Sequence, residues 1–203
     1  MNYSTLKSSI ADFLLRQDLT AVIPTFIELA ETALNRSIRH RRMIARATNN
    51  FDEHFLELPD DFLEAKNVQI NTDPVGTLKY VTLEHADLLR SNRYRSPGQP
   101  QFYTIVGNTL ESTPIPDGDY QVELTYYTKL PVLTDLQPTN WLIATHPDLY
   151  LYGALLHSAP YLKNDERVPV WDGLYQRTVR DVNADSERSE LSGATLQART
   201  FIW

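Results

Sequence analysis

The side chains that could carry out catalysis are scattered along this 203-residue chain and match none of the familiar catalytic spacings. There is no cysteine, no nucleophile elbow, no glycine-rich phosphate loop and no HExxH zinc motif. The nearest approach to a ligand cluster is formed by Asp52, Glu53, His54 and Glu57, which a strand would divide between its two faces. We therefore expect a solvated strand edge there, and we predict no catalytic residue, no metal site and no cofactor.

The sharpest charged feature is a basic run, NRSIRHRRMIAR, in a chain whose net charge is −7. Its five arginines are Arg36, Arg39, Arg41, Arg42 and Arg46. Cations are favourable at the C-terminal end of a helix, so the run has a purely structural explanation. The alternative is a contact patch for an acidic protein surface or for passing DNA, because a guanidinium group binds carboxylate and phosphate through paired hydrogen bonds.

The composition limits the class of protein. Hydrophobic residues make up 42% and charged residues 22%, which is typical of a globular protein. The negative charge opposes a general nucleic-acid coat, and the absence of cysteine suits a reducing compartment. The first residues lack the pattern of a signal peptide, and no apolar run reaches the roughly 20 residues of a membrane span, so we expect no membrane partner.

The spacing of apolar residues predicts helices at both ends of the chain. The first is expected within residues 2–18, capped by Asn2 or Ser4, and the second over about 22–42. A third is expected over about 147–162, where Pro160 should kink or end it. A fourth is expected from Asn164 or Asp165 to beyond Val182, and the residues between the β region and Pro147 read as a Pro-rich connection.

Between Ala45 and Thr128 the apolar period becomes two, which predicts strands. Gly107-Asn108 is typical of a two-residue hairpin turn, and Thr82 is placed to cap one short helix. The strands are expected at 54–58, 67–71, 77–82, 101–106, 109–113 and 120–128.

The predicted fold class is therefore α+β. We expect a discontinuous helical bundle, made of two N-terminal and two C-terminal helices, with an inserted antiparallel β domain and an extended C-terminal tail. The expected segments are an N-terminal helical hairpin (1–44), a β insertion (45–130), a linker with a C-terminal helical hairpin (131–187) and a docking tail (188–203).

The third helix, in HPDLYLYGALLHSAPYLK, is apolar on all sides. Its side chains form three rows along the helix, and two of these rows can face the bundle. The third row, which contains Tyr150 and Tyr161, is then left without a neighbour in the bundle. This row is either core, with tyrosine hydroxyls reaching the surface, or part of a subunit interface, where tyrosine and tryptophan are enriched. The candidate interface residues are Tyr150, Tyr152, His157, Tyr161 and Trp171.

Several blocks, in this order, make the chain resemble the head-to-tail adaptor (connector) proteins of tailed bacteriophages, especially short-tailed phages. The blocks are YSTLKSSIADFLLRQDLTAVIPTFIELAETALNR, LPDDFLE, TYYTKLPVLTD, TNWL, PDLYLYGALLHSAPYLKNDERVPVW and SGATL. The resemblance covers most of residues 3–195 and is weaker between about 66 and 100.

The resemblance implies a structural virion protein of the neck, assembled in the host cytoplasm and without enzymatic activity. Such adaptors form a homo-oligomeric ring, usually twelvefold, below the portal protein. The ring extends the channel through which genomic DNA passes without sequence specificity, and it docks the tail nozzle or tube. The resemblance also implies a C-terminal segment that anchors to the portal, here ending in Phe201, Ile202 and Trp203.

The alternative function is a non-enzymatic regulatory module that binds an acidic partner through the Arg36–Arg46 run. An enzyme with a pocket under the β insertion is a third class, but it would need convergent polar groups that the sequence does not show.

Overall fold

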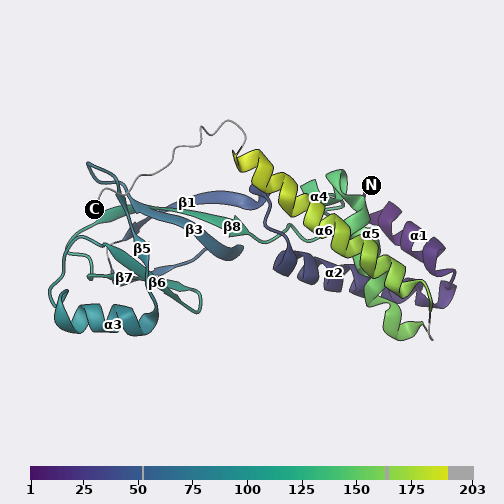
Figure 1. The fold of residues 1–203 in the computed structure, drawn as a ribbon, viewed down its shortest axis with the longest axis horizontal. Coiled ribbons are helices and arrows are strands. Elements are labelled where there is room, and N and C mark those ends of the chain that lie inside the picture. The colour runs from purple at the N-terminus through teal and green to yellow at the C-terminus, as the bar shows by residue number, and fades with distance from the viewer. Residues whose placement is uncertain (52, 163–164, 192–203) are drawn as a thin grey trace, which may run out of the picture. The chain divides into compact units, whose positions relative to one another are not determined.

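The computed structural model describes residues 1–51, 53–162 and 165–191 (Figure 1). The chain divides into two compact units. The helical unit comprises Met1–Arg42 with Leu130–Trp203, and the β unit comprises Met43–Lys129. The α+β class is confirmed, because a bundle of helices is combined with sheets in which all strand pairs but one are antiparallel.

The helical unit begins with α1 (Tyr3–Leu14), whose N-terminus is closed by a capping box between Asn2 and Thr5. A 3-10 turn (Gln17–Val22) leads into α2 (Ile23–Ser37), which has its proline in the first turn as expected. The helix is shorter than predicted, since Ile38 is already extended. Ile38 is fully buried, so its side chain serves the core rather than a further helical turn.

The C-terminal part of this unit consists of α4 (Trp141–Thr145), α5 (Pro147–His157), a 3-10 turn (Ala159–Tyr161) and α6 (Val168–Leu191). Helix α5 ends before Pro160, as expected from its missing backbone donor. Helix α4 lies in what was expected to be a loop. Helix α6 reaches Leu191, so the tail cannot begin at residue 188 as predicted.

The β unit contains two four-stranded sheets. The first has the strand order β1-β8-β3-β4. In it, β1 is Ile44–Phe51, β8 is Tyr120–Thr128, β3 is Phe62–Ile70 and β4 is Gly76–Thr77. The second has the strand order β2-β7-β6-β5. In it, β2 is Phe55–Glu57, β7 is Thr109–Thr113, β6 is Phe102–Val106 and β5 is Lys79–Tyr80. The hairpin turn between β6 and β7 is confirmed, with Gly107 at a φ of 62°.

Strand β8 shows why these residues form a sheet with one buried face. Val122, Leu124 and Tyr126 alternate inward and are buried, whereas the residues between them are at least partly accessible. The inward side chains join a single hydrophobic core for this unit. The buried residues of that core are Phe51, Leu58, Val68, Ile70, Leu78, Tyr103, Leu110, Val122, Leu124 and Tyr126.

One helix belongs to the β unit. Helix α3 (Leu83–Asn92) begins at Thr82, whose hydroxyl accepts from the N–H of His85 at 3.4 Å, as the sequence predicted. The helix packs against β6 and β7, and its only fully covered side chain is that of Ala86. A helix with such a narrow apolar face needs polar contacts to hold it in place, and Arg90 on this helix makes them with His54 and Glu111.

Candidate assembly interface

Helix α5 is the centre of the helical unit. It packs against α1, α2, α4 and α6, so neighbours within the same unit cover most of its apolar circumference. Gly153 marks the closest approach: a Cβ at this position would lie 3.2 Å from the Cβ of Ala30 on α2 and 3.3 Å from the Cε2 of Tyr175 on α6. The helix can be apolar on all sides because these four helices share its surface, and a second subunit is not required for that.

Tyr150 is consequently a core residue, and its assignment to a subunit interface is corrected. Its side chain is fully buried. Its hydroxyl accepts from Nδ2 of Asn140 at 2.7 Å and donates to Oε1 of Glu31 at 3.4 Å. No surface of Tyr150 is left for a neighbouring subunit.

The tyrosine hydroxyl is one part of a buried polar network that holds the segment 130–140 on the helices. Oε1 of Glu31 accepts the backbone N–H of Leu133 at 2.9 Å, and Oδ1 of Asn35, one turn later on α2, accepts that of Leu130 at 2.8 Å. Asn140 accepts from the N–H groups at the start of α4 and donates to the carbonyl of Pro131 at 2.8 Å. The network therefore fixes where the chain enters the helical unit from β8.

Burial raises the pKa of Glu31 to about 7. The N–H of Leu133 and the hydroxyl of Tyr150 oppose this shift by favouring the ionised form, and Glu28 adds to it by like-charge repulsion. Glu31 is only 5% exposed, so its carboxyl group is poised to change charge near neutral pH inside the unit.

The other four predicted interface residues differ in exposure. Trp171 is buried, and the guanidinium carbon of Arg167 lies 5.1 Å from the centre of its ring. Tyr152 and His157 are half-buried. Tyr161 is 48% exposed and packs edge-on against Phe26, at 5.2 Å between ring centres. Among the five, Tyr161 presents the most surface to a partner.

Exposed apolar side chains lie on the same part of the helical unit as Tyr161. A hollow of about 540 Å³ is lined by residues of the α1 end and of the connection between α5 and α6: Leu14, Arg16, Tyr161, Leu162, Asp165 and Arg167. The next residue after α1, Leu15, is 83% exposed and has a φ of 52°. Non-glycine residues seldom adopt this left-handed conformation, so both its backbone and its exposure are costly in the isolated subunit.

The residues of the arginine run belong to two different units. Arg36, Arg41 and Arg42 are exposed in the helical unit, whereas Arg46 lies on β1 in the β unit, 3.7 Å from Glu123. Arg42 also lies near Trp141, at 6.0 Å from the ring centre. The run is thus divided between two units.

Arg39 has a structural role at the end of α2. Its Nη1 donates to the carbonyl oxygens of Asn35 at 2.9 Å and Ile38 at 2.8 Å, which caps the helix C-terminus. The backbone of the same segment is held on α6, since the N–H of Arg39 donates to Asn183 and that of Arg41 to the buried Ser186. For Arg39 the helix-end interpretation of the run is therefore correct.

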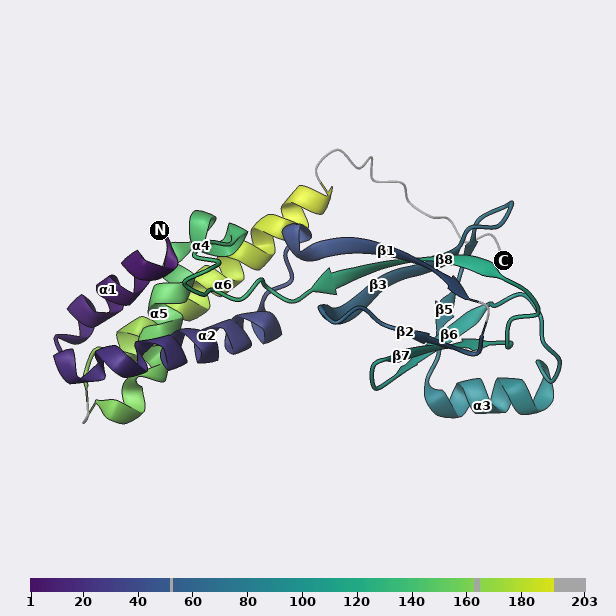
Figure 2. The ribbon, with the colours of Figure 1, turned by 180° about the vertical axis from the view of Figure 1, so that it is seen from behind.

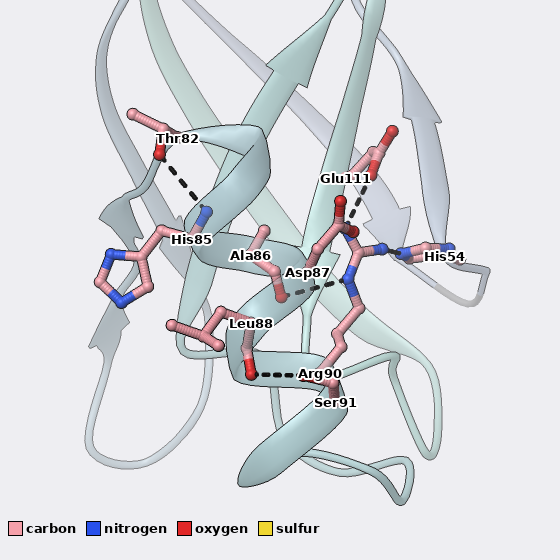
Figure 3. Close-up of polar contacts among 9 residues, drawn as sticks. All are labelled: His54, Thr82, His85, Ala86, Asp87, Leu88, Arg90, Ser91 and Glu111. Carbon is pink, nitrogen blue, oxygen red and sulfur yellow. Dashed lines mark hydrogen bonds and ion pairs between the residues drawn. The ribbon is translucent and has the colours of Figure 1, made fainter.

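In the β unit, Arg90 connects α3 to the second sheet and to the turn before β2 (Figure 3). Its Nη1 lies 2.6 Å from Nε2 of His54, and its Nη2 lies 3.3 Å from Glu111 and 3.2 Å from Asp87. Because arginine only donates, His54 must accept through Nε2 and is neutral. Burial and the charge of Arg90 lower the pKa of His54. This cluster fastens α3, and it does not complete a catalytic or metal-binding set.

Sequence reasoning missed Glu31, Asn140 and Arg90. A signal existed for two of them: Glu31 interrupts the apolar face of α2, and Asn140 precedes an apolar turn in the position of an N-cap. Asp87 is a partner on the same helix, but nothing near Arg90 in sequence indicates its contacts with Glu111 and His54, which lie 21 and 36 residues away. The proposed docking residues Phe201, Ile202 and Trp203 lie outside the described residues.

No group of three or more histidine, aspartate or glutamate side chains in the described part of the chain is arranged to hold a metal ion. None of the described helices has the length and hydropathy needed to cross a membrane.

The described residues form two compact units, with polar clusters that fasten segments to one another and with apolar side chains on the surface. The chain belongs to the SU10 adaptor protein family, whose family model matches residues 1–199. The resemblance to phage head-to-tail adaptors is thereby confirmed, and the protein is a structural adaptor of a bacteriophage. No curated protein matches this chain.

Proposed function

We propose that this protein forms a ring, twelvefold like that of the adaptors it resembles, below the portal in the neck of the virion. In this role it extends the DNA channel and docks the tail nozzle or tube, and it assembles in the host cytoplasm. The observation that carries the proposal is the family match over residues 1–199, which includes both units. An adaptor must contact two different neighbours along the axis, and two separately folded units provide two different surfaces.

The contacts of the helical unit with a neighbour are proposed to lie around Tyr161, together with the half-buried Tyr152 and His157. The exposed Leu15 supports this, because burial in an interface would remove apolar surface from water and offset its unfavourable backbone conformation. Arg36, Arg41 and Arg42 are proposed to face the acidic surface of a partner or the phosphates of passing DNA.

The C-terminal residues Phe201, Ile202 and Trp203 are proposed to anchor the subunit to the portal. Three large apolar side chains at a chain end can fill a groove, and this gain must offset the roughly 1–2 kcal/mol of backbone entropy lost per residue ordered. Deletion of residues 199–203 should leave both units folded and abolish attachment to portal-bearing capsids.

The test is to mix the purified protein with portal-bearing capsids that lack it, and to examine the vertex by cryo-electron microscopy. We expect added ring density below the portal, at the copy number of the portal. Density at another virion position, or a protein that never joins the particle, would contradict the proposal. The deletion variant separates portal anchoring from ring formation, because it should retain contacts between subunits.

A further inference from the structure

Strand β1 has one edge that no other strand of the described residues covers. It pairs with β8 along all eight of its residues, from Ile44 opposite Tyr127 to Phe51 opposite Tyr120. On its other side the sheet ends (Figure 2). The backbone groups that point away from β8 are therefore candidates for pairing with a strand from another chain.

The hydrogen bonds of β8 show which backbone groups of β1 point outward. The N–H of Asn71 donates to the carbonyl of Gln121 at 2.8 Å, so Gln121 bonds toward β3 and its opposite partner Asn50 does not bond to β8. The N–H of Asn50 is indeed taken by the neighbouring side chain of Asn49, at 2.9 Å. By the two-residue period, the residues that point their N–H and C=O groups outward are Ile44, Arg46, Thr48 and Asn50.

This edge lacks most of the features that normally prevent strand addition, and Arg46 is the one charged residue in it. Natural edge strands are short, bulged, or marked by proline or lysine. The outer strands β2 and β5 of the second sheet follow that rule with three and two residues. Strand β1 has eight residues in an unbroken register and contains neither proline nor lysine. An edge of this kind is suited to be covered in the assembled protein.

The opposite end of the same sheet offers a matching surface. There β4 pairs with β3 only at Gln69 and Ile70. A hollow of about 490 Å³ lies beside the first half of β3, and its rim includes Tyr80, which is 59% exposed. The residues that line it are Phe62, Leu63, Glu64, Ala65, Tyr80, Tyr103 and Ile105. A strand placed at this edge would remove apolar surface from water.

The charges and the strand directions at the two edges of the first sheet both favour pairing of one edge with the other. Ile44 and Glu64 both lie opposite Tyr127, so the exposed Arg46 and the exposed Glu64 are on one face of the sheet, at its two ends. Strands β1 and β3 both run antiparallel to β8 and hence parallel to each other. Rotation about an axis along the strands would place β1 of one copy parallel to β3 of the next.

We propose that β1 of each subunit pairs with the β3–β4 edge of a second copy of this chain, so that the sheets join side by side around the ring. Arg46 of one subunit then lies near Glu64 of the next. The contact is heterologous, with a different edge on each side, as a closed ring requires. This inference rests on the proposed function, because it names the contact by which the ring closes.

The first test is Thr48→Pro, with Thr48→Ala as the matched control. The N–H of Thr48 points away from β8, so proline removes an outward donor and blocks an incoming strand while β1 remains paired to β8. We expect the proline variant to stay a folded single subunit under conditions in which the wild type and the alanine variant assemble. The association constant between subunits should fall about tenfold or more, as measured by native mass spectrometry.

The second test uses charge reversal. Arg46→Glu places two acids at each proposed contact, and Glu64→Arg places two bases there, so each variant alone should assemble poorly. An equimolar mixture should assemble, because every contact between unlike subunits then joins opposite charges. Rings from the mixture should contain equal numbers of the two variants, which mass spectrometry of the intact ring detects.

The outcomes separate this inference from the proposed function. If the wild type forms no ring and joins no portal, the proposed function fails. If the wild type assembles and Thr48→Pro assembles equally well, or if mixing the charge variants restores nothing, the edge pairing is wrong and the ring closes elsewhere. If Thr48→Pro instead destabilises the isolated subunit, the edge is covered by the chain's own residues, and the inference is likewise overturned.

Discussion

Oε1 of Glu31 accepts the backbone N–H of Leu133 at 2.9 Å inside the helical unit. A carboxyl group on α2 thus binds the segment 130–140, which follows β8 in the chain. The same oxygen accepts from Tyr150, and burial raises the pKa of Glu31 to about 7. The strength of this fastening therefore depends on pH.

The first prediction follows from that pKa. Between pH 4.5 and pH 7 the folded protein holds a proton on Glu31 that the unfolded chain has lost, so the free energy of unfolding should fall as the pH rises. A shift of this size corresponds to about 3 kcal/mol, fully present below pH 4.5 and lost above pH 7. Glu31→Gln should flatten this part of the profile in urea titrations, and an unchanged profile would contradict the assignment. Glu28→Gln removes only the smallest contribution to the shift and should leave most of the pH dependence in place.

The second prediction concerns the contact between Arg90 and His54. Since the pKa of His54 is lowered in the folded state, the unfolded chain binds a proton first as the pH falls below about 6.5. Stability of the β unit should therefore decrease over that interval and level off below the folded pKa. His54→Gln keeps an acceptor that does not titrate, so the protection factors of the α3 amides against hydrogen exchange should lose their acid dependence. Equal acid sensitivity in this variant would exclude His54 as the cause.

The third prediction tests the close approach of the helices at Gly153. Gly153→Val should lower the free energy of unfolding by about 2–3 kcal/mol, because its side chain would overlap Ala30 and Tyr175. Gly173 is the matched control: it also lies within a helix, but a Cβ there meets no atom within 4 Å. Gly173→Ala should therefore raise stability by about 0.5–1 kcal/mol. Thermal unfolding of the two variants distinguishes a packing constraint from helix propensity.

The fourth prediction divides the arginine run. Arg39→Glu should destabilise the helical unit by about 1–2 kcal/mol, because it removes the cap on Asn35 and Ile38 and places an acid at a helix C-terminus. Arg41→Glu with Arg42→Glu should leave stability within about 0.5 kcal/mol and weaken attachment to capsids in a salt-dependent manner. Undiminished attachment of the double variant, or salt-independent attachment of the wild type, would leave these two arginines without a binding role.

The fifth prediction contrasts two tyrosines that sequence patterning placed together. Tyr150→Phe should cost about 1–3 kcal/mol of folding stability, because Asn140 and Glu31 each lose a buried partner. Tyr161→Ala should cost less, since its side chain is half exposed, but it should impair assembly if the proposed surface is correct. Calorimetry and native mass spectrometry on the same preparations measure the two effects separately.

The sequence by itself determined the features that depend on near neighbours. The caps of α1 and α3, the hairpin at Gly107 and the alternation of β8 follow from residues within a few positions of one another, and the family blocks occur in a recognisable order. Periodicity also placed Tyr150 and Tyr161 in one row of a helix that is apolar on all sides. A period identifies which residues share a face, but it contains no information about what covers that face.

Only the tertiary structure decided what each face meets. Tyr150 became core because Glu31, 119 positions away, and Asn140 meet its hydroxyl, and Arg39 became a helix cap because the chain turns away after Ser37. The open edge of β1 is likewise a property of strand order, which depends on pairing residues some 70–80 positions apart. Such contacts arise from the packing of the whole unit, in which the free energy of burying apolar surface selects partners that local sequence does not specify.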